Sequence, residues 1–278
     1  MMKQIITLSL LFSITIHLQA QITLRGTVAD SLTNEPIGFV NIGILENTNG
    51  TVSTENGDFK LALKDEKNKT IRFSSIGYES KTFTSEDLRK IKKVYLRAVV
   101  YDAGIVKIKA KKFKKQKKLG AKIHAKLNTI AWGSSEFSGL EIGVPIKIRK
   151  ESFIKSAHFG ILKASSANTR LRINIYDFKN GKIGKNLMTE NVFVYAKDLV
   201  RYGKVDLSHL NLVVKNDILL SIETIEKEEK EGFYLIFGSG LRWKGNVYSR
   251  DASQAIFQKN KMENRTKIGA FLKVKQVK

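Results

Sequence analysis

One short stretch decides the fold of the first part of the chain: Gly50-Thr51-Val52-Ser53-Thr54-Glu55-Asn56-Gly57-Asp58-Phe59. Asn56-Gly57 can adopt the positive φ angles that a two-residue hairpin turn requires. The side chains before and after this dipeptide alternate in character, which suits strands with one buried face. The stretch therefore predicts a strand, a tight turn and a second strand within a β-sandwich.

Strand patterns extend from this turn in both directions. In the range 37–45, Val40, Ile42 and Ile44 share one face, and we expect that face to lie in the core. After the turn, apolar residues alternate with lysine and alanine from Phe59 to Lys64, which is typical of a half-buried strand. Further strands are expected at 22–28, 71–74, 81–84 and 94–98, with a capped helical turn at 85–88.

Four motifs in this part of the chain resemble the carboxypeptidase regulatory-like domain and occur in the expected order. They are Arg25-Gly26-Thr27-Val28-Ala29-Asp30, Glu35-Pro36-Ile37-Gly38-Phe39-Val40-Asn41-Ile42, the Gly50 to Phe59 stretch, and Phe73-Ser74-Ser75-Ile76-Gly77-Tyr78-Glu79. That family is a transthyretin-like β-sandwich found at the start of many outer-membrane nutrient receptors and envelope proteins of Gram-negative bacteria. The resemblance covers about residues 22–105. It implies a folding or docking module and transfers no catalytic residue.

Length and composition indicate two domains. A chain of 278 residues with 42% hydrophobic residues has enough apolar material for two cores. We expect a signal peptide at 1–20, the regulatory-like sandwich at 21–104, a basic linker at 105–122 and a second domain at 123–278. The absence of cysteine excludes disulfides, thiolate metal sites and a cysteine nucleophile.

The N-terminus has the layout of a secretory signal peptide. Lys3 supplies a positive end, residues 5–18 are mostly apolar, and Ala20 offers a small residue before a cut near Gln21. No later apolar run reaches membrane-spanning length, so we expect no transmembrane segment in the mature chain. The protein is expected in the periplasm, at the outer-membrane periphery or outside the cell.

The formal net charge of +23 indicates an anionic partner. Export argues against nucleic acid and favours lipopolysaccharide, an anionic polysaccharide or phospholipid headgroups. Another envelope protein is a further candidate partner.

Eight lysines and no acid occur between residues 107 and 118, and such a run is a poor element of any core. They are Lys107, Lys109, Lys111, Lys112, Lys114, Lys115, Lys117 and Lys118. Two interpretations stay open. The run is either a charged spacer between two domains or an electrostatic contact with an anionic envelope surface.

The second part of the chain is again rich in strand patterns. They occur at 141–148, 153–161, 169–177, 191–195, 217–224, 233–237 and 267–274. Leu171, Ile173 and Ile175 alternate with polar residues, and Asn180-Gly181 and Glu231-Gly232 provide turns. This layout predicts a second antiparallel β-sandwich of jelly-roll type.

Little in the sequence indicates catalysis. A zinc peptidase needs closely spaced histidine and glutamate ligands, whereas His124, His158 and His209 are isolated. No nucleophile elbow, phosphate-binding loop or dinucleotide fingerprint occurs, so we expect no cofactor. The alternative enzyme class is a carboxylate-dependent glycan hydrolase, for example one that uses Asp177 and Asp251.

Trp243, Tyr248, Arg250 and Asp251 form a candidate ligand-binding group. Sugar-binding sandwiches stack an aromatic ring on the sugar and bind its hydroxyls with neighbouring polar groups. The alternative for Trp243 is packing on a sheet edge. We therefore expect an exported, non-catalytic envelope protein that acts as a binding or assembly module for glycan or another envelope component. The hydrolase and a purely structural adaptor to an outer-membrane receptor remain alternatives.

Overall fold

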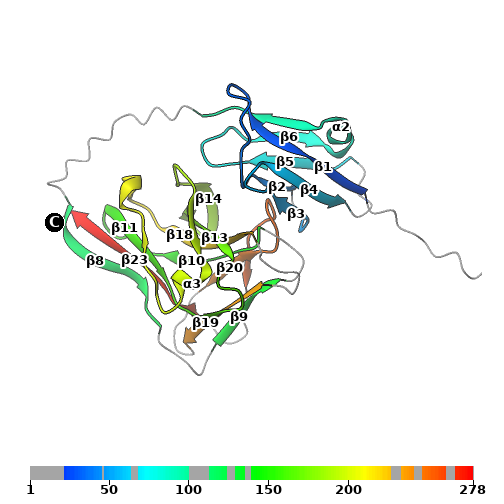
Figure 1. Ribbon diagram of the computed structural model, residues 1–278. Helices are drawn as coiled ribbons and strands as arrows, with labels where there is room; N and C mark the ends of the chain where they lie inside the picture. Colours follow the sequence, from blue (N-terminus) through cyan, green and yellow to red (C-terminus); the bar gives the residue numbers. More distant parts are fainter. Residues whose placement is uncertain are drawn as a thin grey trace, which may run out of the picture.

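The computed structural model describes residues 22–45, 47–63, 68–99, 113–123, 129–134, 139–226, 233–240, 246–260 and 267–277. Strands dominate these ranges, which confirms the predicted all-β fold class (Figure 1). The predicted signal peptide and the lysines between 107 and 112 lie outside the described residues.

The first domain is a sandwich of two small sheets around an apolar core. One sheet has the order β4-β1-β7, from β4 (Asp58–Leu63), β1 (Ile22–Asp30) and β7 (Lys93–Leu96). The other has the order β3-β2-β5-β6, from β3 (Gly50–Val52), β2 (Asn41–Ile44), β5 (Thr70–Ser74) and β6 (Lys81–Thr84). Val40, Ile42 and Ile44 lie in the core between them, as predicted. Helix α2 (Ser85–Lys90) begins after Thr84, whose Oγ1 accepts the Asp87 N–H.

The turn at Asn56-Gly57 differs from the prediction. Gly57 has a φ of +78°, as expected, but Asn56 is not among the residues with positive φ. Backbone bonds from Gly57 N–H to Thr54 O and from Thr54 N–H to Asp58 O close a three-residue loop with a glycine bulge. Beyond this loop β3 pairs with β2 and β4 pairs with β1, so the turn carries the chain from one sheet to the other.

The second domain is a larger antiparallel β-sandwich, as predicted. We call its first layer the β13–β18 sheet. It contains β14 (Lys182–Asn186), β13 (Arg170–Lys179), β18 (Ile218–Glu226), β10 (Glu141–Ile146), β20 (Val247–Arg250) and β21 (Gln258–Asn260) in that order, with β15 (Val192–Tyr195) paired to β13.

The opposite layer consists of two sheets. The β11–β23 sheet has β16 (Val205–Asp206), β11 (Ser152–Phe159), β23 (Ala270–Val277) and β8 (Phe113–Ala121) in order, with β17 (Val213–Val214) paired to β11. The other sheet contains β12 (Ile161–Ala164), β19 (Phe233–Gly240), β22 (Lys267–Ile268) and β9 (Thr129–Ser134). The short helices α3 (Ala196–Leu199) and η2 (Ser208–Leu210) lie in the connections.

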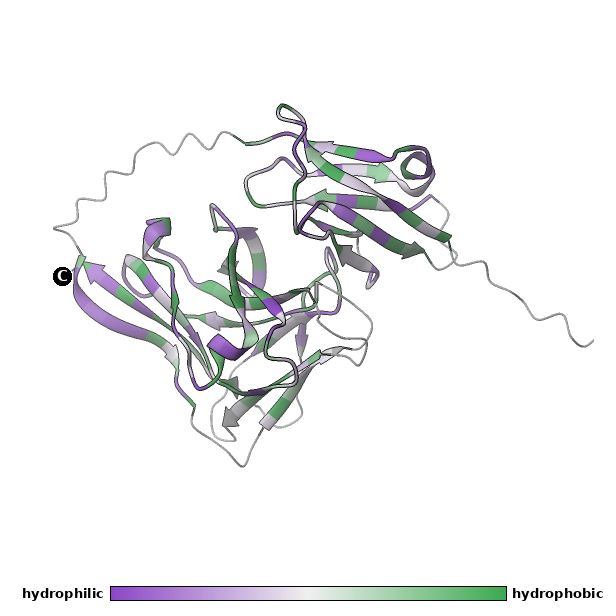
Figure 2. Cartoon of the chain, viewed as in Figure 1, coloured by the Kyte–Doolittle hydropathy of each residue, from purple (hydrophilic) through white to green (hydrophobic). Residues whose placement is uncertain are grey.

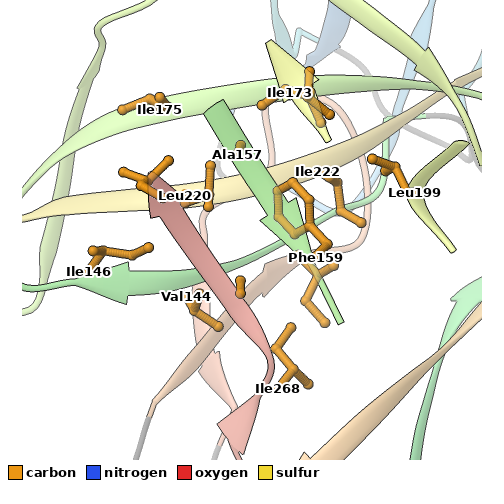
Figure 3. Packing of buried hydrophobic residues seen from close by; sticks show 14 of the residues in the cluster. Val144, Ile146, Ala157, Phe159, Ile173, Ile175, Leu199, Leu220, Ile222 and Ile268 are labelled. Carbon is orange, nitrogen blue, oxygen red and sulfur yellow. The ribbon is translucent and has the colours of Figure 1, made fainter. Parts of the chain in front are cut away.

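One apolar core fills the space between the layers. Ile173 and Ile175 of β13 and Leu220 of β18 approach Ala157 and Phe159 of β11 (Figure 3). All five side chains are at most 1% exposed. Side chains at the alternate positions of each strand point away from this core. Each layer therefore also has an outer face.

Strand β8 corrects the prediction of a linker at 105–122 for residues 113–121, whereas residues 105–112 lie outside the described residues. Residues 113–121 pair along their length with β23, although β8 is hydrophilic over most of its length (Figure 2). The backbone hydrogen bonds of a ladder do not depend on the side chains, and exposed lysines on an edge strand remain hydrated. Phe113 and Ala121 anchor the two ends because both are buried.

Asn180-Gly181 forms the turn that the sequence had predicted for Asn56-Gly57. Both residues have positive φ, at 51° and 79°, and Lys179 pairs with Lys182 across the two-residue loop. The same dipeptide therefore makes two different turns in this chain. The strands that flank Asn56-Gly57 belong to different sheets, whereas those that flank Asn180-Gly181 pair with each other.

Candidate ligand-binding cleft between the two domains

The outer face of the β13–β18 sheet carries a row of four charged residues. Cross-strand pairing places Arg172 opposite Glu223, Glu223 opposite Glu141, and Glu141 opposite Arg250. The row runs across β13, β18, β10 and β20 and is the direct result of the period-two alternation in each strand. We call it the charged row.

The charged row is held by ion pairs within a buried layer. Arg172 Nε and Nη2 donate to Glu223 Oε2 at 3.0 and 2.8 Å. Arg250 Nη2 lies 2.6 Å from Glu141 Oε2 and 3.5 Å from Glu223 Oε1. Both glutamates are 0% exposed, so each carboxylate depends on its arginine for a counter-charge.

Neutral side chains donate further hydrogen bonds to the two carboxylates. Asn174 Nδ2 donates to Glu141 Oε1 at 3.0 Å and to Glu223 Oε2 at 2.9 Å. Tyr176 Oη donates to Glu141 Oε2 at 3.1 Å, and Ser221 Oγ donates to Glu141 Oε1. These donors make the charged row a connected network.

Burial sets the protonation properties of this network. It raises the pKa of Glu141 above its ordinary value, and the charge of Arg250 only partly opposes that effect. Burial also raises the pKa of Tyr176, with a further contribution from Glu141. Burial acts to lower the pKa of Arg250, but the combined effects of Glu141, Tyr176 and Glu223 outweigh burial, and the pKa is raised. Arg250 therefore stays cationic.

The first domain covers part of the charged row through Arg172. Arg172 Nη1 donates to Phe39 O at 3.0 Å and to Asn191 Oδ1 at 3.2 Å, while Nη2 donates to Asn41 Oδ1. Together with the two bonds to Glu223, these contacts use all five N–H donors of the guanidinium. Arg172 therefore ties the two domains together and has no donor left for a ligand.

Phe39 and Asn41 belong to the face of the predicted 37–45 strand that does not point into the first core. Phe39 has a φ of +58° and packs on Phe193 of the second domain, with ring centroids 4.8 Å apart. Val52 and Ile225 complete a small apolar cluster around it. A third, smaller core thus forms between the domains.

The segment after β20 closes the other side of this contact. Gln254 Nε2 donates to Asn41 O at 3.2 Å and to Ser74 Oγ at 2.6 Å. A Cβ at Gly43 would lie 2.2 Å from Ser253 O, and one at Gly50 would lie 2.3 Å from it. Only glycine permits so close an approach of the two backbones.

A cleft of about 400 Å³ remains beside these contacts, lined by both domains. Its cationic lining residues are Arg72, Arg172, Lys185 and Arg250, and its amide residues are Asn41, Asn174, Asn186 and Gln254. Ser74, Ser75, Ser80, Tyr78 and Tyr176 add hydroxyl groups. None of the residues found to line it is Asp or Glu.

Several donors of the cleft are available to a ligand. Arg72 and Lys185 are exposed, and Arg72 Nη2 donates to Ser80 Oγ at 2.9 Å. Arg250 is 8% exposed, and its Nε is itself buried and makes no hydrogen bond within the described structure. The cleft thus combines exposed cations at its rim with a buried guanidinium and amides at its base.

The structure separates the four residues predicted as a ligand group. Arg250 lines the cleft, whereas Tyr248 is 5% exposed and packs on Phe178, with centroids 5.3 Å apart. Asp251 is exposed and lines a second cavity, to which Arg250 also contributes. Trp243 lies outside the described residues. Tyr248 therefore belongs to a packed cluster and cannot be a surface platform for a sugar ring.

The residues that sequence reasoning missed are Arg172, Glu141, Glu223 and Asn174. The available signal was a polar residue at alternate positions of an otherwise apolar strand, and it is clear only in β13, with Arg170, Arg172 and Asn174. That pattern is also typical of a solvent-facing strand, so it does not distinguish a buried site from a wet surface.

The other sequence candidates are dispersed. His158 is buried on β11, and His209 Nε2 lies 3.0 Å from Glu190 Oε1 at the surface. Asp177 and Asp251 line separate cavities. Over the described ranges, no group of three His, Cys, Asp or Glu side chains is arranged to hold a metal ion. In the same ranges, no helix has the length and apolar character needed to cross a bilayer.

Of the predicted anionic-surface lysines, Lys114, Lys115, Lys117 and Lys118 are exposed on β8. The other four, Lys107, Lys109, Lys111 and Lys112, lie outside the described residues.

Comparison with known proteins supports the family resemblance. Residues 24–99 match the family profile described as "CarboxypepD_reg-like domain", which confirms the resemblance found in the N-terminal part. No curated protein sequence matches the chain.

Two solved structures share low similarity with the chain. One is described as a "putative carbohydrate binding protein" from Bacteroides uniformis ATCC 8492, with 12% identity over 92% of this chain and 98% of that chain and a TM-score of 0.20. The other is from infectious bursal disease virus Gx strain, with 10% identity over 94% of this chain and 64% of that chain and a TM-score of 0.22. Superpositions this poor carry no argument about fold or ligand.

Proposed function

Because residues 24–99 form a carboxypeptidase regulatory-like domain, we propose that the chain is an exported, non-catalytic binding module whose interdomain cleft takes a glycan. The observation that carries this proposal is the chemistry of the cleft, which is lined by cations, amides and hydroxyls from both domains. Such a lining offers many hydrogen bonds and no apolar pocket. It fits a polyhydroxylated ligand better than an apolar one.

The charge of the cleft favours an acidic glycan. Arg172 and Arg250 are paired to Glu223 and Glu141, so these four charges balance. The exposed cations Arg72 and Lys185 are then the excess charge of the lining. A uronate or a sulfated or phosphorylated sugar would complete their charge-assisted hydrogen bonds.

The buried carboxylates favour binding over hydrolysis. A glycan hydrolase places two carboxyl groups against the scissile bond of its substrate. Glu141 and Glu223 are 0% exposed, are engaged by arginines, and do not line the cleft. They position Arg250 and Arg172, which do line it.

Titration calorimetry with neutral and uronate-containing oligosaccharides tests the proposal. Arg72→Gln with Lys185→Gln should weaken uronate binding about tenfold for each lost contact, since such a bond contributes about 1.4 kcal/mol or more. The matched control is Arg25→Gln with Lys60→Gln, which removes two exposed cations elsewhere in the first domain. It should leave binding unchanged.

Equal binding by the cleft variant and the control would refute the cleft as the site. Glycan turnover that is abolished by a single Asp or Glu substitution, for example Asp177→Asn or Asp251→Asn, would establish the hydrolase instead. Capture of an outer-membrane receptor from envelope extract, with no glycan bound, would favour the structural adaptor.

Export is part of this proposal and is supported by the charge and hydropathy layout of residues 1–20. Cell fractionation with N-terminal sequencing should recover a chain that begins near Gln21 in the envelope or the medium. Recovery of the uncut chain in the cytoplasm would contradict it.

A further inference from the structure

The outer face of the β11–β23 sheet contains a basic hollow of about 500 Å³. This sheet and the charged row belong to opposite layers of the second domain. We call the hollow the lysine groove. Its lysines are Lys117, Lys118, Lys155, Lys204, Lys273 and Lys275. Asp206 is the acid found in its lining and pairs with Lys204 at 3.1 Å. The other five lysines have no acidic counterpart in that lining.

Sheet register brings these lysines together from three adjacent strands. Lys118 of β8 lies directly opposite Lys273 of β23, and Ser156 of β11 lies opposite Lys273 on the other side. Residues directly opposite each other have Cβ atoms about 4.5–5.5 Å apart, and like charges there are destabilising. The arrangement therefore concentrates positive charge at a cost to the isolated protein.

Aromatic rings hold two of the ammonium groups in place. Lys118 Nζ lies 4.8 Å from the centroid of Phe271, and Lys155 Nζ lies 5.4 Å from that of Phe153. Phe271 is itself fixed by stacking on His158, with centroids 4.5 Å apart. The cations are thus positioned before any ligand arrives.

His158 contributes no charge to the groove near neutral pH. Its Nδ1 and Nε2 contact Tyr202 O and Ser156 Oγ, both at 3.1 Å. Burial lowers its pKa, and the charges of Lys273, Lys118 and Lys204 lower it further. The positive charge of the groove near neutral pH therefore comes from lysine.

We propose that the lysine groove binds a segment of an acidic polysaccharide through the anionic groups along its chain. A linear polyanion can enter a hollow and meet lysines on three strands, whereas a bilayer presents a flat surface. The lining has no aromatic side chain on which a nucleic-acid base could stack, and Phe271 beneath it is 3% exposed. This site is separate from the interdomain cleft and does not depend on the function proposed for it.

The test uses the full mature chain and a variant with Lys118, Lys155, Lys273 and Lys275 changed to Gln. The matched control changes Lys60, Lys69, Lys90 and Lys92 to Gln, which removes the same charge from exposed positions in the first domain. Heparin and polygalacturonate serve as acidic polysaccharides and dextran as a neutral one. Phosphatidylglycerol vesicles and a single-stranded oligonucleotide provide the competing partners.

The unmodified chain should bind heparin or polygalacturonate but not dextran, and binding should weaken with salt. The groove variant should lose at least tenfold in affinity. Its slope of log affinity against log salt should fall by about 0.7 for each lost contact, while the control keeps the original slope. Unchanged thermal unfolding of the groove variant would show that its loss of binding is local.

Equal losses of affinity in the groove variant and the control would show that binding depends only on the net charge of the protein, and would overturn the proposal. Stronger binding to vesicles or to the oligonucleotide than to either polysaccharide would assign the groove to a different partner. Full binding by the groove variant would place the contact elsewhere on the chain.

Discussion

The two outer faces of the second sandwich differ in the sign, burial and pairing of their charged side chains. Both lie above the same apolar core and both follow from side chains that alternate along strands. On the β13–β18 sheet the charges have both signs, are buried, and are covered in part by the first domain. On the β11–β23 sheet they are almost all lysine and remain in contact with water.

The difference shows that alternation alone does not assign a role to a polar face. What lies above the sheet decides whether its charges must be paired. A buried charge without a partner is strongly destabilising, whereas an exposed lysine is hydrated and costs little. The charged row therefore stabilises the fold only as a complete network, and the lysine groove is free to bind a ligand.

Arg172→Met is expected to have the largest effect. It leaves Glu223 buried without its main counter-charge and removes the hydrogen bonds to Phe39 and Asn41, so unfolding should become easier by about 3–5 kcal/mol. Urea denaturation measures this change. Arg149→Met, at an exposed position, is the control and should change stability by less than about 0.5 kcal/mol.

If Arg172→Met lowered the free energy of unfolding as little as Arg149→Met does, the charged row would not be required as a complete network. Combining Arg172→Met with Glu223→Leu should recover part of the loss, because the unpaired carboxylate is then absent.

Gly43→Val tests whether the first domain is what keeps the charged row buried. Its Cβ would lie 2.2 Å from Ser253 O, so the domains must shift, at a cost of about 1–3 kcal/mol. Gly184→Val is the control because the nearest atoms to its Cβ, on Asp177, are 3.3 Å away. Hydrogen exchange should rise at the edges of the interdomain contact in Gly43→Val alone. Equal exchange in both variants would contradict the described contact.

Substitutions in the lysine groove should change the stability in the direction opposite to Arg172→Met. Changing Lys118, Lys155, Lys273 and Lys275 to Gln relieves repulsion, so stability at low salt should stay the same or rise by up to about 1 kcal/mol. The gain should vanish at high salt, where the charges are screened. A clear loss of stability would mean that these lysines support the fold as Arg172 does.

Glu141 gives the smallest predicted effect, on the pH dependence of unfolding. Because burial raises its pKa in the folded state, the folded protein binds a proton at Glu141 more readily than the unfolded chain does. This contribution to stability is present at low pH and is lost as pH rises through the folded pKa. The unfolding free energy of the unmodified chain should therefore rise relative to that of Glu141→Gln as pH is lowered from 8 to 5. Parallel profiles would indicate that Glu141 is not perturbed.

The sequence by itself determined the local features of this protein. It placed the strands that begin near Glu141, Arg170 and Ile218, assigned Leu171, Ile173 and Ile175 to a common face, and identified the regulatory-like domain that residues 24–99 match. These features follow from the alternation of apolar and polar side chains along a strand and from turn residues. Both signals depend on residues only a few positions apart in the sequence.

Only the tertiary structure decided the roles of the polar faces. Arg172 is buried because Phe39 and Asn41, more than a hundred positions earlier, lie against it. Lys118 belongs to a strand because β23, near the end of the chain, supplies its ladder. Alternation tells which residues share a face, whereas burial and pairing depend on segments distant in the sequence that pack against that face.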